Sequence, residues 1–304
     1  ILTNVGKIIN PLFLAFLAVL VVMCFIKPMG SVSSAAPTGE YVAHPFFRGF
    51  LEGYNTMDVL AALAFGNILV NAIKRLGLSD PKALSYSTIV SGTFSTALMA
   101  IIYLALTYVG AQSRAVYGVD ANGGDVLAHI AAHYFGAFGG ILLGITITCA
   151  CLKTAIGLVT ACSTTFVELF PRSLPYPKYA VLFSLFSFAI SNVGLSKIIT
   201  YSLPVLYFLY PIAIVLIALC LLEGLVGCHR PLYVYTMIGT CAAASFDFLR
   251  ALPSGLQEAL PMMDFLRTLG DTLPLAHIGM GWTQPTLVGF IIGVLVLLLQ
   301  RRTR

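Results

Sequence analysis

Eight apolar runs separated by short polar connections organise the chain. Each run except the fourth is close to the ~20 residues that cross a lipid bilayer as a helix, and none shows the short alternation of a membrane β-barrel. The fourth run is longer, which predicts a tilted or projecting helix, and Asp247 interrupts the end of the seventh. The pattern predicts an all-α integral membrane protein with eight transmembrane helices, at residues 8–26, 53–73, 86–110, 139–170, 179–199, 201–222, 232–252 and 281–300.

Composition supports the same class of protein. Apolar residues make up 59% of the 304 positions and charged residues 10%, and the mean hydropathy is +0.93. Soluble domains are closer to one half apolar and one quarter charged. The net charge of +5 is small and scattered, which argues against nucleic-acid binding. The lipid bilayer is therefore the expected partner.

The cysteines and the start of the chain add two expectations. The seven cysteines form no C-x-x-C pair and lie within or beside apolar runs, so we interpret them as small packing residues. The sequence begins with Ile1 and enters its first run almost at once, without a signal peptide. We interpret this start as an interior cut of a longer protein.

Basic residues predict the orientation of the runs. They are more frequent at alternate connections, at Lys7, Lys74, Arg75, Lys82, Arg172, Lys178, Arg230, Arg301, Arg302 and Arg304. The other connections hold fewer, at Lys27, Arg48, Arg114, Lys197, Arg250 and Arg267. Because positive charge favours the cytoplasmic side, both chain ends are expected in the cytoplasm, which agrees with an even number of spans.

The second run opens with a polar cluster. Glu52, Gly53, Tyr54, Asn55, Thr56 and Asp58 precede an otherwise apolar stretch. One interpretation places the cluster in an interfacial loop. However, residues 59–73 alone make a short span, so the favoured interpretation is a helix interrupted inside the bilayer, with backbone groups turned toward a cavity. The helix N-terminus after the break would bind a carboxylate and the carbonyls before it an ammonium.

The fourth run places Lys153 near its middle, beside Cys151 and Thr154. A lysine so deep in the bilayer is expected to face a cavity, a partner or an ion site. Two interpretations have equal weight. Lys153 is either a structural ion-pair partner, or its ammonium sits at or replaces a coupling-cation site. Small residues throughout this run predict close helix packing in both cases.

Other polar sets carry weaker signals. Asp125, His129 and His133 share one helical face, a spacing that zinc can use, but a wetted face of the external segment 118–139 is the favoured interpretation. The aromatic residues Tyr201, Tyr207, Tyr210 and the single Trp282 fit interfacial anchoring. Enzymatic motifs are missing, and Asp58 and Asp247 are too far apart in sequence to be taken as a catalytic pair. We expect no catalytic residues, no metal site and no cofactor.

Three segments carry a family resemblance. GFLEGYNTMDVLAALAFGNILVNAIKRLG at 49–77, ACLKTAIGLVTAC at 150–162 and SNVGLSKIITYSLPVLYFLYP at 191–211 resemble, in the same order, the branched-chain amino acid transport system II carriers of the BrnQ family. The resemblance implies a bacterial inner-membrane symporter of leucine, isoleucine and valine driven by sodium ions or protons. It also implies twelve spans with the five-plus-five inverted repeat of the LeuT type.

Aligned in this way, the chain lacks the first four spans of the family. Its first run is the fifth span, residues 53–58 lie in the discontinuous sixth, and its fourth run is the eighth. We therefore expect a fragment that does not transport by itself. The resemblance implies that residues 53–58 hold the amino-acid backbone and that Thr154 and the carbonyl of Cys151 help to coordinate sodium. Phe50, Met57 and Phe65 either line an apolar side-chain pocket or belong to the core. The alternatives are a carrier of another amino acid or amine on the same fold, or an inactive truncated membrane fragment.

Overall fold

The computed structural model describes residues 2–77, 80–253, 255, 257, 268, 270 and 272–302, and within these ranges all regular secondary structure is helical. The chain divides into two compact units, residues 1–36 with 64–192 and residues 37–63 with 193–304. Helix α3 (Asp58–Arg75) contributes its beginning to the second unit and its remainder to the first. Arg267 and Arg304, used above to predict orientation, lie outside the described residues.

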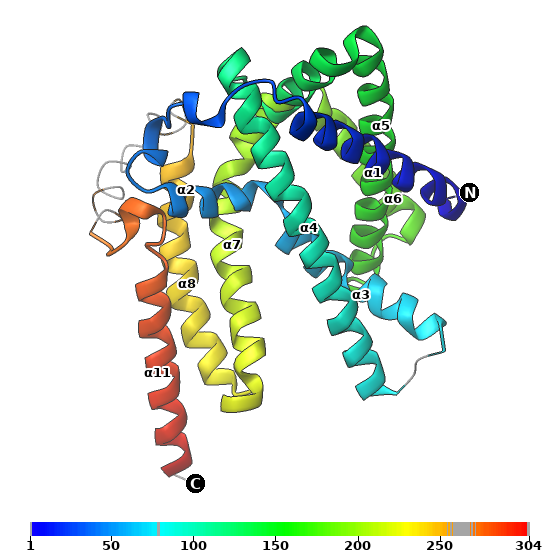
Figure 1. Cartoon of the computed structure of the whole chain (residues 1–304). Coiled ribbons are helices and arrows are strands. Elements are labelled where there is room, and N and C mark those ends of the chain that lie inside the picture. The colour runs from blue at the N-terminus through cyan, green and yellow to red at the C-terminus, as the bar shows by residue number, and fades with distance from the viewer. Residues whose placement is uncertain are drawn as a thin grey trace. The chain divides into compact units, whose positions relative to one another are not determined.

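The first unit contains four long helices (Figure 1). They are α1 (Leu2–Ile26), α4 (Pro81–Tyr117), α5 (Gly123–Leu169) and α6 (Tyr176–Ser191), with a 3-10 turn, η1 (Val32–Ser34), after α1. Helices α1, α4 and α5 meet around a buried apolar cluster of Phe16, Leu20, Cys24, Val109, Ile130, Ala131 and Leu143. The three members from α1, Phe16, Leu20 and Cys24, recur every four residues and therefore lie on one face of that helix.

Polar side chains bond to the backbone at the ends of these helices. Asp80 caps α4 by accepting a hydrogen bond from the Ala83 amide at 2.9 Å, and Asn122 caps α5 in the same way. The buried Gln112 side chain accepts from the Met29 amide at 3.3 Å and donates to the Cys24 carbonyl at 3.4 Å. Gln112 thus supplies partners for the backbone where α1 ends.

Helix α5 bends sharply at Gly136, whose φ of 61° is left-handed. Glycine reaches this conformation without the steric cost that a Cβ imposes. The residues before the bend form a short helix within segment 118–139, and the fourth apolar run lies within the residues after it.

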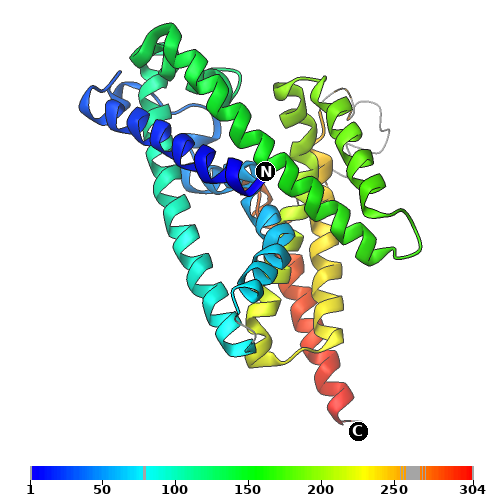
Figure 2. The same ribbon diagram turned by 90° about the vertical axis from the view of Figure 1, so that its right-hand side faces the viewer.

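The second unit combines three long helices with a short, broken one. Helices α7 (Leu195–Val226), α8 (Arg230–Ala251) and α11 (Thr283–Arg302) run side by side (Figures 1 and 2). Helix α2 (Pro45–Glu52) leads into the 3-10 turn η3 (Gly53–Thr56), and two further 3-10 turns are η2 (Gly39–Tyr41) and η4 (Ala276–Ile278). The apolar core between the long helices contains Val215, Leu219, Leu232, Ala243 and Trp282.

Glycines bring α8 and α11 into close contact. A Cβ on Gly239 would collide with the carbonyl of Pro285, and a Cβ on Gly289 with the carbonyl of Tyr235. At Gly293 it would come within 2.8 Å of the Leu232 Cα. Backbone-to-backbone packing through small residues is the usual way in which membrane helices associate. The buried Thr240 and Thr286 hydroxyls, 2.9 Å apart, add a hydrogen bond between these helices.

The observed helices overlap the predicted runs, but not all of them have the length of a membrane span. Five helices of the described chain have the length and apolar character needed to cross a bilayer: Pro81–Tyr117, Gly123–Leu169, Leu195–Gly224, Arg230–Ala251 and Thr283–Gln300. Pro11–Ile26 is a shorter apolar helix. The predicted fifth run, 179–199, is divided between α6 and α7 because the chain leaves the helix after Ser191 and Gly194 adopts a φ of 91°. An all-helical structure with several long apolar helices is thus confirmed, while the number of eight spans stays a prediction.

The glycine contacts predict a sharp difference between two Gly→Ala variants. Gly289→Ala forces α8 and α11 apart and should lower stability by about 1–3 kcal/mol, the usual cost of overpacking. Gly92→Ala is the matched control, because a Cβ at this α4 position meets nothing within 4 Å and alanine favours helix by about 1 kcal/mol. Thermal unfolding in detergent, followed by Trp282 fluorescence, measures both. Equal midpoints for the two variants would contradict the close packing.

Candidate functional site

The polar cluster at residues 53–58 is a break between two helices. Helix α2 ends at Glu52, η3 covers Gly53–Thr56, and α3 starts at Asp58. Met57 has a left-handed backbone with φ 58° and ψ 13°, a conformation that non-glycine residues rarely adopt. The predicted interruption is therefore present. Gly53, Tyr54, Asn55, Thr56 and Met57 lie within it, and Asp58 is the first residue of the helix that follows.

Local side chains stabilise the break. The Thr56 hydroxyl donates to the Gly53 carbonyl at 2.8 Å, and the Met57 amide donates to the Tyr54 carbonyl at 3.2 Å. The Glu52 carboxylate accepts hydrogen bonds from Arg48 at 2.6 Å and from Asn55 at 2.7 Å. Short polar side chains that bond to nearby backbone compete with the helix, which explains why the sequence leaves the α conformation here.

An aromatic stack anchors the break to α7. The rings of Tyr54 and Tyr210 lie parallel with centroids 4.4 Å apart, and Tyr207 contacts Tyr54 at 6.0 Å. Tyr54 is 4% exposed and Tyr210 is 2% exposed, and they pack with Leu51 and Leu206 in one apolar cluster. The turn is thus held by burial of a large aromatic side chain as well as by its own hydrogen bonds.

Three buried polar atoms in this region have no hydrogen-bond partner among the described residues: the hydroxyls of Tyr54 and Tyr210 and the indole nitrogen of Trp282. The Tyr54 hydroxyl lies toward Trp282. The Tyr210 hydroxyl lies toward the Thr56 hydroxyl and the Met57 and Val59 amides, outside hydrogen-bonding geometry. An unsatisfied buried polar group costs about 1–3 kcal/mol, and such groups call for an explanation such as a ligand or water.

These contacts correct the interfacial role predicted for Tyr210 and Trp282. Both side chains are buried, at 2% and 8% exposure, inside the packed core of the second unit. Tyrosine and tryptophan are amphipathic, so their positions along the sequence fit a membrane interface and a core with a polar centre equally well. Tyr207, Tyr210 and Trp282 are the members of this site that sequence reasoning missed.

The other predicted site residues belong to the first unit. Cys151, Lys153 and Thr154 lie on one turn of α5 with exposed side chains, and the Thr154 hydroxyl donates to the Ala150 carbonyl at 3.2 Å. The ring of Phe65 lies against Gly157 of α5. Phe50 and Met57, the other side chains proposed for an apolar pocket, lie at the break and are partly exposed. Cys151, Lys153, Thr154 and Phe65 thus belong to the first unit, whereas Phe50 and Met57 belong to the second.

The histidines of segment 118–139 make hydrogen bonds with other partners instead of converging on one point. His129 contacts the Asp120 carboxylate at 3.2 Å and stacks on Tyr117, whose hydroxyl lies 3.1 Å from His133. The Asp125 carboxylate accepts from the Asn122 amide group. Among the described residues, no group of three or more histidine, cysteine or acidic side chains is arranged to hold a metal ion.

The left-handed backbone at Met57 makes a directional prediction. Met57→Gly should keep or raise stability, whereas Met57→Val should lower it by about 1–2 kcal/mol, because a branched Cβ is disfavoured at positive φ. The same two changes at Leu63, an exposed position within α3, should show the opposite order, because glycine weakens a regular helix. Thermal unfolding of the four variants tests this. A Met57→Gly protein less stable than Met57→Val would rule out the left-handed turn.

Comparisons with known proteins identify the family. A family model described as "Branched-chain amino acid transport protein" matches residues 1–300. The chain is 44% identical to the branched-chain amino acid permease BrnQ of Lactobacillus delbrueckii subsp. lactis, over 95% of this chain and 64% of that protein. It is 40% identical to BrnQ of Bacillus subtilis, over 100% and 67%, and 38% identical to the branched-chain amino acid transport system 2 carrier protein of Pseudomonas aeruginosa, over 96% and 64%.

These matches span about two thirds of the length of the curated relatives. No solved structure matches the chain. The family match extends over nearly all of the chain and includes both helices that flank the break. The chain belongs to the branched-chain amino acid transport protein family.

Proposed function

We propose that this chain forms part of a secondary active symporter that imports leucine, isoleucine and valine by alternating access. The observation that carries the proposal is the helix break at Gly53–Met57, which joins α2 to α3 and is bordered by buried polar atoms without partners. Discontinuous helices with such breaks form substrate sites in transporters. The substrate class follows the names of the relatives, which are branched-chain amino acid permeases and carriers.

The break presents the two kinds of backbone group that an amino acid needs. The first amides of α3 are not used inside that helix and carry the positive end of its dipole, which favours the substrate carboxylate. The last carbonyls of α2 carry the negative end and favour the ammonium. Glu52 is held by Arg48 and Asn55, so its charge is balanced by a neighbouring guanidinium. Gly53, Tyr54, Asn55, Thr56, Met57 and Asp58 would then surround the substrate backbone.

The coupling ion is proposed to be sodium or a proton, with Cys151, Lys153 and Thr154 of α5 at the coupling site. Lys153 carries the only charge in its stretch of α5 between Asp125 and Glu168, and a charge in a membrane helix marks a functional position by default. The proposed architecture is the LeuT-type twelve-helix carrier, located in the bacterial plasma membrane with a cytoplasmic C-terminus.

Substrate binding at the break predicts that Tyr54→Phe separates activity from stability. Loss of an unsatisfied buried hydroxyl should leave stability unchanged or raise it by up to about 1–3 kcal/mol. If the hydroxyl contacts substrate, uptake of radiolabelled leucine should fall about tenfold, the value of one lost hydrogen bond. Uptake is measured in cells expressing the chain in its complete genomic reading frame. Tyr201→Phe, at an exposed α7 position, is the matched control and should transport normally.

Competition in the same assay tests the substrate class. Unlabelled isoleucine and valine should inhibit leucine uptake, while an amino acid with a charged side chain should not. Uptake that neither isoleucine nor valine inhibits would favour a carrier of another amino acid or amine. If Tyr54→Phe takes up leucine as well as the wild type, the Tyr54 hydroxyl does not contact the substrate.

A coupling role for Lys153 predicts an altered ion dependence in Lys153→Ala. If the ammonium occupies the cation's place and supports proton coupling, its loss should abolish the stimulation of leucine uptake by external acid. Uptake is measured at several pH values with and without sodium, and Lys178→Ala, in the first turn of α6, serves as the control. Unchanged pH and sodium dependence in Lys153→Ala would assign the lysine a structural role.

A further inference from the structure

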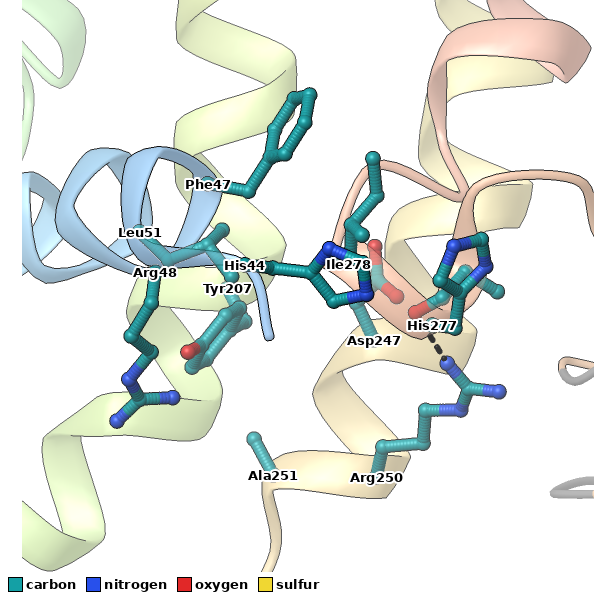
Figure 3. A pocket seen from close by; sticks show the side chains of 12 residues that line it. His44, Phe47, Arg48, Leu51, Tyr207, Asp247, Arg250, Ala251, His277 and Ile278 are labelled. Carbon is teal, nitrogen blue, oxygen red and sulfur yellow. Dashed lines mark hydrogen bonds between the residues drawn. The ribbon is translucent and has the colours of Figure 1, made fainter. Parts of the chain in front are cut away.

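The second unit contains a pocket of about 270 Å³ that is lined by residues of α2, α7 and α8 and by the loop at 276–279. Figure 3 shows Phe47, Arg48, Leu51 and Tyr207 on one side, Asp247, Arg250, His277 and Ile278 on the other, and His44 between them. Its volume is at the lower end of the range for small-molecule sites, which suits a ligand about the size of a single amino acid.

Asp247 gives the pocket an acidic pole. This residue lies near the end of α8, is 8% exposed, and lines the cavity. A carboxylate removed from water is costly unless a cation or hydrogen-bond donors compensate it. The nearby Arg250 donates to the Ala276 carbonyl at 3.1 Å, which directs part of its guanidinium toward the loop that precedes α11. A buried carboxylate that opens into a cavity is suited to bind an ammonium group.

The basic pole comes from two histidines and Arg48. The rings of His44 and His277 face the same cavity with centroids 5.7 Å apart. A neutral imidazole donates one N–H in either tautomer, so this pair offers donors to a carboxylate across the physiological pH range. Arg48 contributes positive charge at the edge of the pocket while its guanidinium also bonds to Glu52.

Apolar side chains complete the wall. Phe47 and Leu51 of α2 face Ile278 of η4 in the lining. The loop lies directly on α2, because a Cβ on Gly279 would collide with the Leu51 side chain, and Gly279 has a φ of 73° that favours glycine. This close approach places the apolar surface beside both polar poles.

We propose that this pocket is a second binding site for an amphipathic zwitterion, namely an α-amino acid with an apolar side chain. Its ammonium binds Asp247, its carboxylate binds the His44 and His277 donors, and its side chain lies against Phe47, Leu51 and Ile278. The site is separate from the helix break at residues 53–58. The choice of a branched-chain amino acid as probe rests on the proposed function, whereas the arrangement of acidic, basic and apolar groups does not.

Binding of radiolabelled L-leucine to the purified chain in detergent tests the site. Asp247→Asn and His277→Ala should each weaken binding about tenfold or more, because each removes a charge-assisted contact. Asp247→Glu keeps the carboxylate and should retain binding. Asp120→Asn in the first unit is the control that should leave this binding unchanged. The single tryptophan, Trp282, lies just after the lining loop and gives a second readout by fluorescence.

Two analogues of leucine test the zwitterion on the unmodified chain. Leucinamide lacks the carboxylate and 4-methylpentanoate lacks the ammonium, so each should bind about tenfold or more weakly than leucine. If the circular dichroism spectrum of Asp247→Asn shows that this variant does not fold, the comparison of the three compounds on the unmodified chain still tests the site. Equal affinities for the three compounds, or no saturable binding up to about 10 mM leucine, where even a millimolar site is filled, would overturn the proposal.

The outcomes separate this site from the proposed function. If the unmodified protein does not take up leucine but binds it in a way that depends on Asp247, the transport proposal is overturned and the pocket is supported. Normal uptake together with binding that is insensitive to Asp247→Asn and His277→Ala but lost in Asn55→Ala would place the only leucine site at the helix break and overturn the pocket.

Discussion

The central constraint on this molecule is that peptide groups in an apolar environment must find partners, which makes any interruption of a helix costly. The break between α2 and α3 meets this constraint with local bonds. The Thr56 hydroxyl and the Met57 amide bond within the turn, and Glu52 is fixed by Arg48 and Asn55. Met57 adopts a left-handed backbone, a strain that persists only where surrounding contacts determine the conformation. Here the buried stack of Tyr54 on Tyr210 supplies those contacts.

The same stack buries polar atoms that have no hydrogen-bond partner among the described residues. The hydroxyls of Tyr54 and Tyr210 and the indole of Trp282 lie in the core of the second unit without hydrogen-bond partners among the described residues. A structural core would be more stable with phenylalanine at the tyrosine positions. The proposed substrate site would give these hydroxyls a binding role, in keeping with a family of amino-acid transport proteins.

Helix packing in the second unit explains how such a site is held in place. Gly239, Gly289 and Gly293 let α8 and α11 approach until their backbones touch. This contact positions Trp282 at the start of α11 and Asp247 near the end of α8. Asp247 in turn belongs to the pocket formed with α2 and the loop at 276–279. The rigid glycine-packed pair thus supports both the aromatic stack and the pocket, and α2 connects the pocket with the helix break.

The sequence by itself determined the all-helical membrane class and the place of the helix break. Both follow from local physics, because apolar runs of a given length favour membrane helices and Gly53, Asn55 and Thr56 disfavour a continuous helix through their own backbone and side-chain preferences. Tertiary structure alone decided which distant residues meet that break and which line the pocket at 276–279. Tyr210, Asp247 and Trp282 carry no local signal for a site, since an amphipathic ring or a single carboxylate fits an interface as well as a core. Likewise, the division of residues 179–199 between α6 and α7 depends on the conformation of Gly194, which an otherwise apolar run does not reveal.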